Sequence, residues 1–431
     1  MNFIQRMMRE WNSLSRNIKL FFLANILFQI GGGMFSVLYN LFIQGLGYAD
    51  AMNGRIISIQ SLATALMFIP VGLLGDRTSR KRLLIIGALF TGLAFIGRSF
   101  LVTEFNLLSF AVLTGLFTSI FQVLAIPFLA ESVPVSQRLR VFSYYSSLVL
   151  ASQVIGSMGG GILADMLQGL GVNRVSSLQI VLTTGGIATF AAFIPLLLII
   201  EPSKAVKSIH ATPTVVPQTV PVRNRTLKSE YKIIGQFALV QLIIGIGSGL
   251  VIPYLNLYFT NRFAVSLSTV GLLISLGQIM TIVSMLIGPS LAGRIGSVKA
   301  IICFQMLSLP FLLLTGFTNI LAIAAISFLF RQALMNAANP ILSTVLIDRV
   351  SDSKRGIANS MTQTAFMLGW ALMGPVQSYL ITSYGHYWGY AITFSITGTL
   401  YVGASILYYS MFRDSRKPGS KGTHTSIEYI I

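Results

Sequence analysis

The feature that most constrains this chain is a series of apolar runs, each long enough to cross a bilayer. A membrane-spanning helix needs roughly 20 apolar residues, and only helices or closed barrels satisfy their backbone polar groups in lipid. The runs lack the strict alternation of apolar and polar residues that barrel strands show. Of the 431 residues, 54% are hydrophobic and 10% are charged, whereas soluble domains carry about 25% charge. We therefore predict an all-α membrane protein.

Twelve spans can be counted, six on each side of a polar stretch. They cover residues 18–45, 53–74, 83–102, 106–130, 141–164, 178–200, 233–259, 267–291, 299–317, 319–346, 357–382 and 387–411. Residues 201–231 are rich in Pro, Val, Thr and basic side chains without apolar periodicity, which is typical of a linker. The predicted organisation is an N-terminal segment (1–17), a first half (18–200), this linker, a second half (232–412) and a tail (413–431).

The basic residues predict the orientation of the chain. The net charge is +18, and with both termini on one side, 25 of the 30 Lys and Arg flank the spans on that side. Cytoplasmic loops carry such an excess of basic residues, so both termini and the linker are predicted to be cytoplasmic in a plasma membrane. The exceptions are four arginines at the outer edges and one inside a span: Arg55, Arg98, Arg174, Arg262 and Arg331. This distribution favours topology over nucleic-acid binding as the reason for the charge.

An internal repeat relates the two halves. At a constant offset of 217 residues, Gly54 matches Gly271 and Arg77 matches Arg294. Acidic and basic positions at the ends of later spans also match, as in the pair Glu131 and Asp348 and the pair Arg138 and Arg355. The repeat predicts two pseudo-symmetric halves of six helices each.

The loop between the second and third spans concentrates charge. It reads Gly72-Leu-Leu-Gly-Asp76-Arg77-Thr-Ser79-Arg80-Lys81-Arg82. This stretch resembles the signature of the major facilitator superfamily, Gly-x-x-x-Asp-Arg-x-Gly-Arg-Lys/Arg, with Ser79 in place of a glycine. The resemblance, which covers residues 18–412, implies the fold of that family, with twelve helices in two halves. It also implies a secondary transporter that works by alternating access.

The resemblance assigns gating roles around this loop. In the family the loop latches the cytoplasmic ends of the two halves, which implies that Asp76 faces the helix that starts near Gly356 and that Arg80 pairs with Glu131. The alternative is that these charges only enforce topology. The full set of predicted latch residues is Gly72, Asp76, Arg77, Arg80, Lys81, Glu131 and Arg138. The second copy has Gly293 in place of the acid, so we expect a weaker latch there.

Arg331 is a cation near the middle of the predicted span 319–346, and no acid lies at a similar depth. A charge at that depth costs several kcal/mol unless it faces protein or water. Its expected partners are therefore backbone carbonyls, aromatic faces or an anionic group of a substrate, and a purely structural role stays open. In the family, helices 1, 4, 7 and 10 line the cavity, so the predicted substrate-binding residues are Arg331, Gln332, Asn336, Asn339, Gln29, Asn40, Gln122, Gln241 and Asn256. Second choices are Tyr144, Tyr145, Gln153, Gln363 and Trp370.

Two features bear on drug efflux and ion coupling. The glycines of the span 141–164 loosely resemble the fifth-helix motif of drug–proton antiporters, but without its Gly-Pro step they favour close helix packing. All twelve acids lie in loops or at span ends. Proton coupling would therefore have to use an edge acid, Asp76, Glu131 or Asp165, or a solute that carries the proton.

The prediction for function is a monomeric transporter of a small organic solute, with an anion as one option and protons as an optional partner. Alternatives are a proton-coupled exporter of hydrophobic compounds and a uniporter without ion coupling. A membrane sensor would usually add a folded soluble domain, for which the linker and the tail are too short. A membrane enzyme would need paired carboxylates, a nucleophile or a set of metal ligands within the spans, and the sequence has none. Cys303 is the only cysteine and the three histidines are dispersed. We therefore predict no enzyme activity, no cofactor and no metal site.

Overall fold

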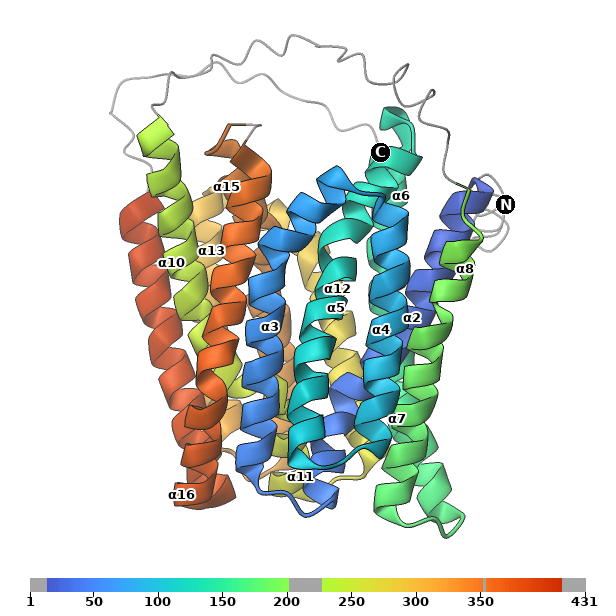
Figure 1. Cartoon of the computed structure of the whole chain (residues 1–431). Helices are drawn as coiled ribbons and strands as arrows, with labels where there is room; N and C mark the ends of the chain where they lie inside the picture. The colour runs from blue at the N-terminus through green and yellow to red at the C-terminus, as the bar shows by residue number, and fades with distance from the viewer. Residues whose placement is uncertain (1–13, 201–226, 352–353, 413–431) are drawn as a thin grey trace, which may run out of the picture.

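The structure is a computed structural model that describes residues 14–200, 227–351 and 354–412. These residues form a bundle of long helices (Figure 1). The first half contains α2 (Arg16–Gly45), α3 (Asp50–Arg77), α4 (Arg80–Phe100), α5 (Glu104–Ser132), α6 (Val135–Gly169), α7 (Arg174–Ala191) and α8 (Phe193–Leu197). The second half contains α10 (Leu227–Val251), the 3-10 turn η1 (Ile252–Tyr254), α11 (Leu255–Phe263), α12 (Leu267–Ile295), α13 (Ser297–Phe317), α14 (Leu321–Ala337), α15 (Asn339–Asp348) and α16 (Arg355–Phe412).

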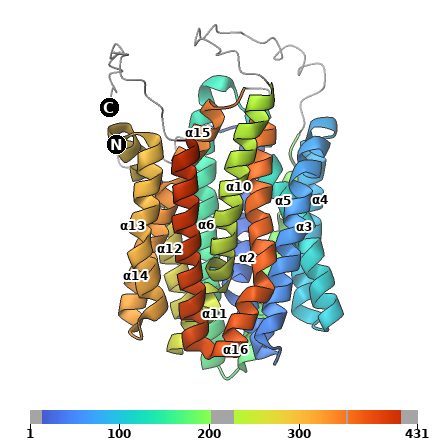
Figure 2. The same cartoon turned by 90° about the vertical axis from the view of Figure 1, so that its left-hand side faces the viewer.

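Eleven helical segments of the described chain are long and apolar enough to cross a membrane. One of them, α16, has 58 residues and contains Gly385 in a non-helical conformation, with φ 72° and ψ 175°. Only glycine adopts such a positive φ without strain, and the helix turns back at this point (Figure 2). Arg349, just before α16, donates a hydrogen bond to the carbonyl of Phe412 at its far end. The two arms of α16 therefore count as two spans, and the predicted all-α fold of twelve transmembrane helices is confirmed.

Three predicted segments fall largely outside the described residues. These are the N-terminal segment 1–17, of which the description begins at residue 14, the linker 201–231, which is described from 227 onward, and the tail 413–431. Two predicted spans contain breaks. The predicted span 233–259 bends at η1, where Pro253 cannot donate to the helix ladder, and the predicted span 319–346 divides at Ala338, just before Pro340.

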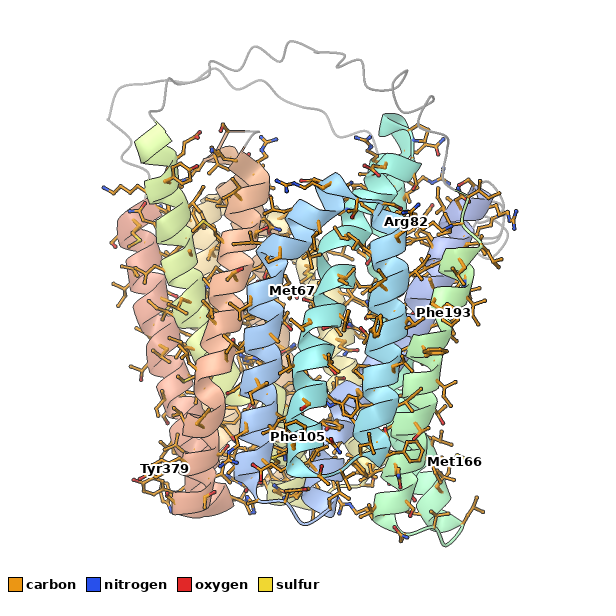
Figure 3. All side chains as sticks on the ribbon, viewed as in Figure 1. Met67, Arg82, Phe105, Met166, Phe193 and Tyr379 are labelled. Carbon is orange, nitrogen blue, oxygen red and sulfur yellow. The ribbon has the colours of Figure 1, made fainter. Side chains whose placement is uncertain are left out.

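The helices run up and down, so the bundle has two ends. The terminal end carries Arg16, the start of α4 and Phe412, and the opposite end carries Gly45, Phe100 and Gly385 (Figure 1). In Figure 3, Arg82 lies at the terminal end, and Phe105 and Tyr379 lie at the opposite end. Large apolar side chains are exposed along the outer helices, including Leu66, Ile187, Leu286, Ile326 and Ile406. Such a surface is the kind that lipid covers.

The two halves meet along α3 with α16 and along α6 with α12. Glycines permit the close approach, because a Cβ built on Gly54 of α3 would lie 2.5 Å from the carbonyl oxygen of Gly374 of α16. On the other pair, a Cβ on Gly271 of α12 would lie 2.5 Å from the carbonyl oxygen of Ser157 of α6. Small residues at helix crossings are the usual way that membrane helices pack closely.

Polar contacts between the halves gather toward the opposite end. Asn40 of α2 donates to the carbonyl of Pro253 at 2.7 Å and to Oδ1 of Asn256 at 3.2 Å. Asp165, near the end of α6, accepts from the backbone amides of Leu267 and Ser268 at the start of α12. These bonds hold the two halves together at that end of the bundle.

Candidate solute cavity and gate residues

A cavity of about 380 Å³ lies between the two halves. From the first half, α2, α3 and α4 contribute Gly32, Phe35, Ser36, Tyr39, Asn40, Ile56, Ile57, Gln60, Ser61, Phe95 and Arg98. From the second half, the region from η1 to α16 contributes Ile252, Pro253, Leu255, Asn256, Ile274, Gln278, Phe328, Gln332 and Trp370. The walls are thus apolar and aromatic with a few converging polar groups, which is the composition typical of small-molecule sites. Among these described lining residues, Arg98 is the one with an ionised side chain.

Three of the predicted substrate-binding residues, Asn40, Asn256 and Gln332, line this cavity, as does the second choice Trp370. Two of them also join the halves, because Asn40 and Asn256 are hydrogen-bonded to each other. Asn256 further donates to the carbonyl of Val37 at 2.7 Å. These amides therefore combine a position on the cavity wall with a contact between the halves.

A second cavity, of about 240 Å³, lies inside the second half, toward the terminal end. Its lining includes two of the predicted substrate-binding residues, Gln241 of α10 and Asn339 of α15, and the second choice Gln363 of α16. The structure thus separates two members of the predicted substrate-binding set, since Gln332 lines the larger cavity and Asn339 the smaller.

The remaining polar candidates lie elsewhere. Gln29 accepts a hydrogen bond from Gln153 at 2.9 Å within the first half. Asn336 donates to the backbone carbonyl of Gln332 and accepts from Asn339. Gln122 is exposed. Of the second choices, Tyr144 accepts from Arg140 and Tyr145 packs against Phe21 and Phe22.

Arg331 is buried, with 4% of its surface exposed. Its guanidinium donates to Oε1 of Gln332 and to the hydroxyl of Tyr401 on the second arm of α16, both at 3.0 Å. It is absent from the described lining of the larger cavity, which its neighbour Gln332 reaches. Of the partners expected for this cation, the structure supplies an aromatic face, since the centroid of the Tyr401 ring lies 5.9 Å from Cζ of Arg331. The hydroxyl of Tyr401 and the amide of Gln332 were not among the expected partners.

The contact with Tyr401 yields a stability prediction. Tyr401→Phe should destabilise the protein by about 1–3 kcal/mol, because it leaves a buried guanidinium nitrogen without its acceptor. Thermal unfolding of the detergent-solubilised protein measures the change. Tyr409→Phe, at a half-exposed tyrosine of the same arm, should leave the melting temperature unchanged, and equal losses in both variants would contradict the assigned role of this bond.

Arg98 is the cavity residue that sequence reasoning missed. Its position near the end of α4 suggested an outer edge, but its side chain is only 2% exposed and lies inside the bundle. Its Nη1 donates to Oε1 of Gln60 at 2.9 Å and to Thr114 at 3.3 Å, and the ring of Tyr39 lies 3.8 Å from its Cζ. A long arginine side chain can extend well away from its helix position, so depth along the helix was a poor guide. The polar residues Gln60 and Ser61 on α3 were a signal that was available but unused.

The charged loop folds as the resemblance implied in one respect. Arg80 pairs with Glu131 at 3.1 Å, and also with Asp76 at 2.9 Å. This confirms the predicted Arg80–Glu131 contact, which joins α4 to the end of α5. Asp76, in contrast, is 71% exposed and bonds to Arg80 of its own half rather than to the start of α16.

Of the other predicted latch residues, Lys81 ties parts of the first half together. Lys81 donates to the carbonyls of Leu197 and Ile199, where the last helix of that half ends. The Ser79 side chain accepts from the amide of Arg82 and so caps α4, which gives this residue a role that the glycine of the family signature cannot fill. Gly72 and Arg138 are half-buried, and Arg77 is exposed in the last turn of α3.

Comparisons with known proteins agree with this architecture. The family model described as "Major Facilitator Superfamily" matches residues 21–234 and 237–427. An uncharacterized MFS-type transporter of Methanocaldococcus jannaschii is 22% identical over 83% of this chain and 89% of its own length. The multi-drug resistance efflux pump PmrA of Streptococcus pneumoniae is 25% identical over 78% and 82%.

Among solved structures, a bacterial homolog of the human lysosomal transporter Spinster, in an inward-facing and occupied conformation, superposes with a TM-score of 0.71. It is 16% identical, and the match covers 91% of this chain and 95% of that one. At this identity the likeness concerns the fold. The family match along nearly the whole sequence agrees with the two six-helix halves and the cavity between them. This chain therefore belongs to the major facilitator superfamily of membrane transporters.

Proposed function

We propose that this protein is a secondary transporter that moves a small organic solute across the cell membrane by alternating access. The observation that carries the proposal is the cavity shared by both halves, which the Asn40–Asn256 contact closes toward the opposite end. A site between two rocking halves is what alternating access requires. The proposed working unit is a monomer, since one chain supplies both walls, and its activity is transport rather than catalysis.

The proposed orientation has both termini in the cytoplasm, supported by the excess of basic residues on that side of the spans. With this orientation the opposite end is external. The contacts between Asp165 and the start of α12 then form an external gate that is shut. The described conformation is accordingly an inward-facing one, in which an exposed Asp76 is expected because its partner helix has moved away.

In the proposed cycle, Asp76 engages the start of α16 when the cytoplasmic end closes. Helix N-termini attract carboxylates because their first amides are unpaired and the helix dipole is positive there. Arg80, held by Glu131, would position the acid from behind. The ion pairs of Arg80 with Asp76 and Glu131 are partly exposed, and such pairs contribute only about 0–1 kcal/mol to stability. Their proposed role is therefore to stabilise the state in which the cytoplasmic end is closed.

This gate predicts an asymmetry between the two copies of the charged loop. Asp76→Asn should lower the transport rate several-fold, because it removes the charge that the helix dipole attracts. Arg294→Gln, in the second copy whose acid is replaced by Gly293, should change the rate much less. Initial uptake rates in vesicles at equal protein density compare the two. Equal losses would count against a latch dominated by the first half.

A second candidate is a proton-coupled exporter of hydrophobic compounds, favoured by the likeness to the efflux pump PmrA. Among the described lining residues of the larger cavity none is acidic or a histidine. Proton coupling would then depend on an acid at the gate, such as Asp165, or on a solute that carries the proton. Uniport, without any coupled ion, is the third possibility, and the transport assay separates these modes.

The proposal is tested in vesicles containing the purified full-length protein. The probes are radiolabelled xylose, uridine and benzoate, together with the dye ethidium, which represent neutral, anionic and cationic solutes. We expect saturable counterflow of at least one probe, faster than in protein-free vesicles. If transport is coupled to protons, a pH gradient should drive accumulation of the solute inside the vesicles. If the protein is a uniporter, the solute should reach equal concentrations inside and outside. Absence of protein-dependent movement for every probe would refute the transport proposal.

A further inference from the structure

We propose that Arg98 binds an anionic group, a carboxylate in particular, of the transported solute. The inference deepens the proposed function, on which it rests, by naming the solute class and the group that selects it. Arg98 lines the cavity between the halves from the first-half side, while the wall formed by the second half carries neutral polar groups. One fixed positive charge therefore faces a site that otherwise offers hydrogen bonds and apolar surface.

The charge of Arg98 has no counter-ion in the described part of the chain. Its hydrogen-bond partners, Gln60 and Thr114, are neutral, and Tyr39 covers it with an aromatic face. A buried cation inside a membrane protein costs several kcal/mol unless it is compensated. A carboxylate in the cavity would supply the missing negative charge where the protein supplies none.

The guanidinium also keeps donors in reserve. Both of its hydrogen bonds come from Nη1, and its buried Nε has no partner in the described structure. An arginine carries five N–H donors in a planar fork that matches the two oxygens of a carboxylate. Gln60 and Thr114 fix one branch of this fork, so it is preorganised for a ligand to approach the remaining donors.

Two other arginines of the bundle show what a structural role looks like here. Arg262 is bonded to the carbonyls of Gly316, Tyr387 and Thr318 and to Asn319, which ties loops of the opposite end together. Arg331 is bonded to Tyr401 and Gln332, and neither arginine belongs to the described lining of the cavity. Arg331 is also buried, with neutral partners and a buried Nε that has none, so the position on the cavity wall is what distinguishes Arg98.

The surroundings of Arg98 restrict the rest of the solute. Phe35, Tyr39 and Phe95 flank it on the first half, and Phe328 and Trp370 belong to the facing wall. These rings favour an apolar or aromatic body, and the amides of Asn256, Gln278 and Gln332 can bond a second polar group. The class that fits is a small organic monoanion, such as an aromatic or short aliphatic carboxylate.

The test uses matched pairs of probes on the full-length protein in detergent. Benzoate, indole-3-acetate and hexanoate are compared with benzamide, indole-3-acetamide and hexanamide, which have the same shape without the charge. We expect at least one carboxylate to raise the melting temperature of the wild type while its amide does not. Arg98→Gln should weaken the affinity for that carboxylate about tenfold or more, and Arg98→Lys should restore part of it.

The matched control is Arg174→Gln, which removes an exposed positive charge near the opposite end of the same half and should bind the carboxylate as the wild type does. Unliganded melting temperature and elution volume verify that each variant is folded.

Unchanged carboxylate binding by folded Arg98→Gln, or binding of amides only, or no response to any carboxylate, would each overturn the proposal. Transport of xylose or uridine without carboxylate binding would refute the anion site alone. Arg98-dependent binding without any transport would refute the transport proposal alone.

Discussion

Gly54→Ala should lower the transport rate at least tenfold. A Cβ at this position would lie 2.5 Å from the carbonyl oxygen of Gly374 and closer still to Oγ of Ser378, both on the other half. Backbone cannot give way locally, so α3 and α16 must separate. Overpacking of this kind costs about 1–3 kcal/mol, and every 1.4 kcal/mol shifts an equilibrium tenfold. The substitution is therefore expected to disfavour the state that is closed at the opposite end and to stall the cycle.

The approach is mutual, which provides an independent test of the same contact. A Cβ on Gly374 would collide with the carbonyl oxygen of Gly54 and with Oγ of Ser58, so Gly374→Ala should have a similar effect from the second half. The control is Gly159→Ala in α6, where a Cβ meets nothing within 4 Å. Uptake in vesicles is the measurement. Near-normal uptake by folded Gly54→Ala would show that this crossing does not limit the cycle.

Asp165→Asn should shift the protein toward the state that is open at the opposite end. The carboxylate accepts from Leu267 at 3.2 Å and from Ser268 at 2.7 Å, so it adds a cap from the first half to the start of α12. Ser266 caps the same helix from within its own half. Carboxylates at helix N-termini contribute about 0.3–2 kcal/mol, and charge-assisted bonds are roughly twice as strong as neutral ones. We expect about a three- to thirtyfold shift, because this cap exists only while the opposite end is closed.

The control for Asp165 is Glu104→Gln. Glu104 is an exposed acid at the same end, and its partner Arg55 belongs to the same half, so the pair persists in either state. The shift can be measured with a cysteine introduced at Gln278, which lines the cavity from α12. The quantity measured is the rate at which a membrane-impermeant thiol reagent, added outside, modifies this cysteine. Asp165→Asn should raise this rate, and Glu104→Gln should not. A rate unchanged by Asp165→Asn would remove this contact from the gate.

The fold was largely predictable from the sequence because bilayer-spanning runs leave few alternatives. The count of twelve spans followed from apolar length and the two halves from the repeat, whereas the Arg80–Glu131 contact followed from the family resemblance. The turn within α16 is a finer point. Gly385 adopts a positive φ there and lies in the short gap between the predicted spans 357–382 and 387–411, so the place of the turn was predicted and its backbone conformation was not.

The lining of the cavity was less predictable, because which side chains point into it depends on the rotation of each helix about its axis and on the length of the side chain. Arg98 seemed to lie at an edge by its place in the chain, yet its long side chain lies inside the bundle beside Gln60 and Tyr39. Arg331 lies at the expected depth but contacts Tyr401, a partner 70 residues away that no local pattern reveals. Gln122 lies on a helix expected to face the cavity, but it is exposed and absent from the described cavity lining.

In alternating access the two ends of the bundle open and close in opposition, and distances measured at both ends of the same protein reveal whether they do. In a Cys303→Ser background, spin labels at Thr103 and Ser383 span the halves at the opposite end, and labels at Gln137 and Lys299 span them at the terminal end. Double electron–electron resonance then measures the distance within each pair of labels in the Asp165→Asn and Gly54→Ala proteins. We expect longer distances at the opposite end together with shorter ones at the terminal end. Distances that change at one end only, or in the same direction at both, would contradict alternating access.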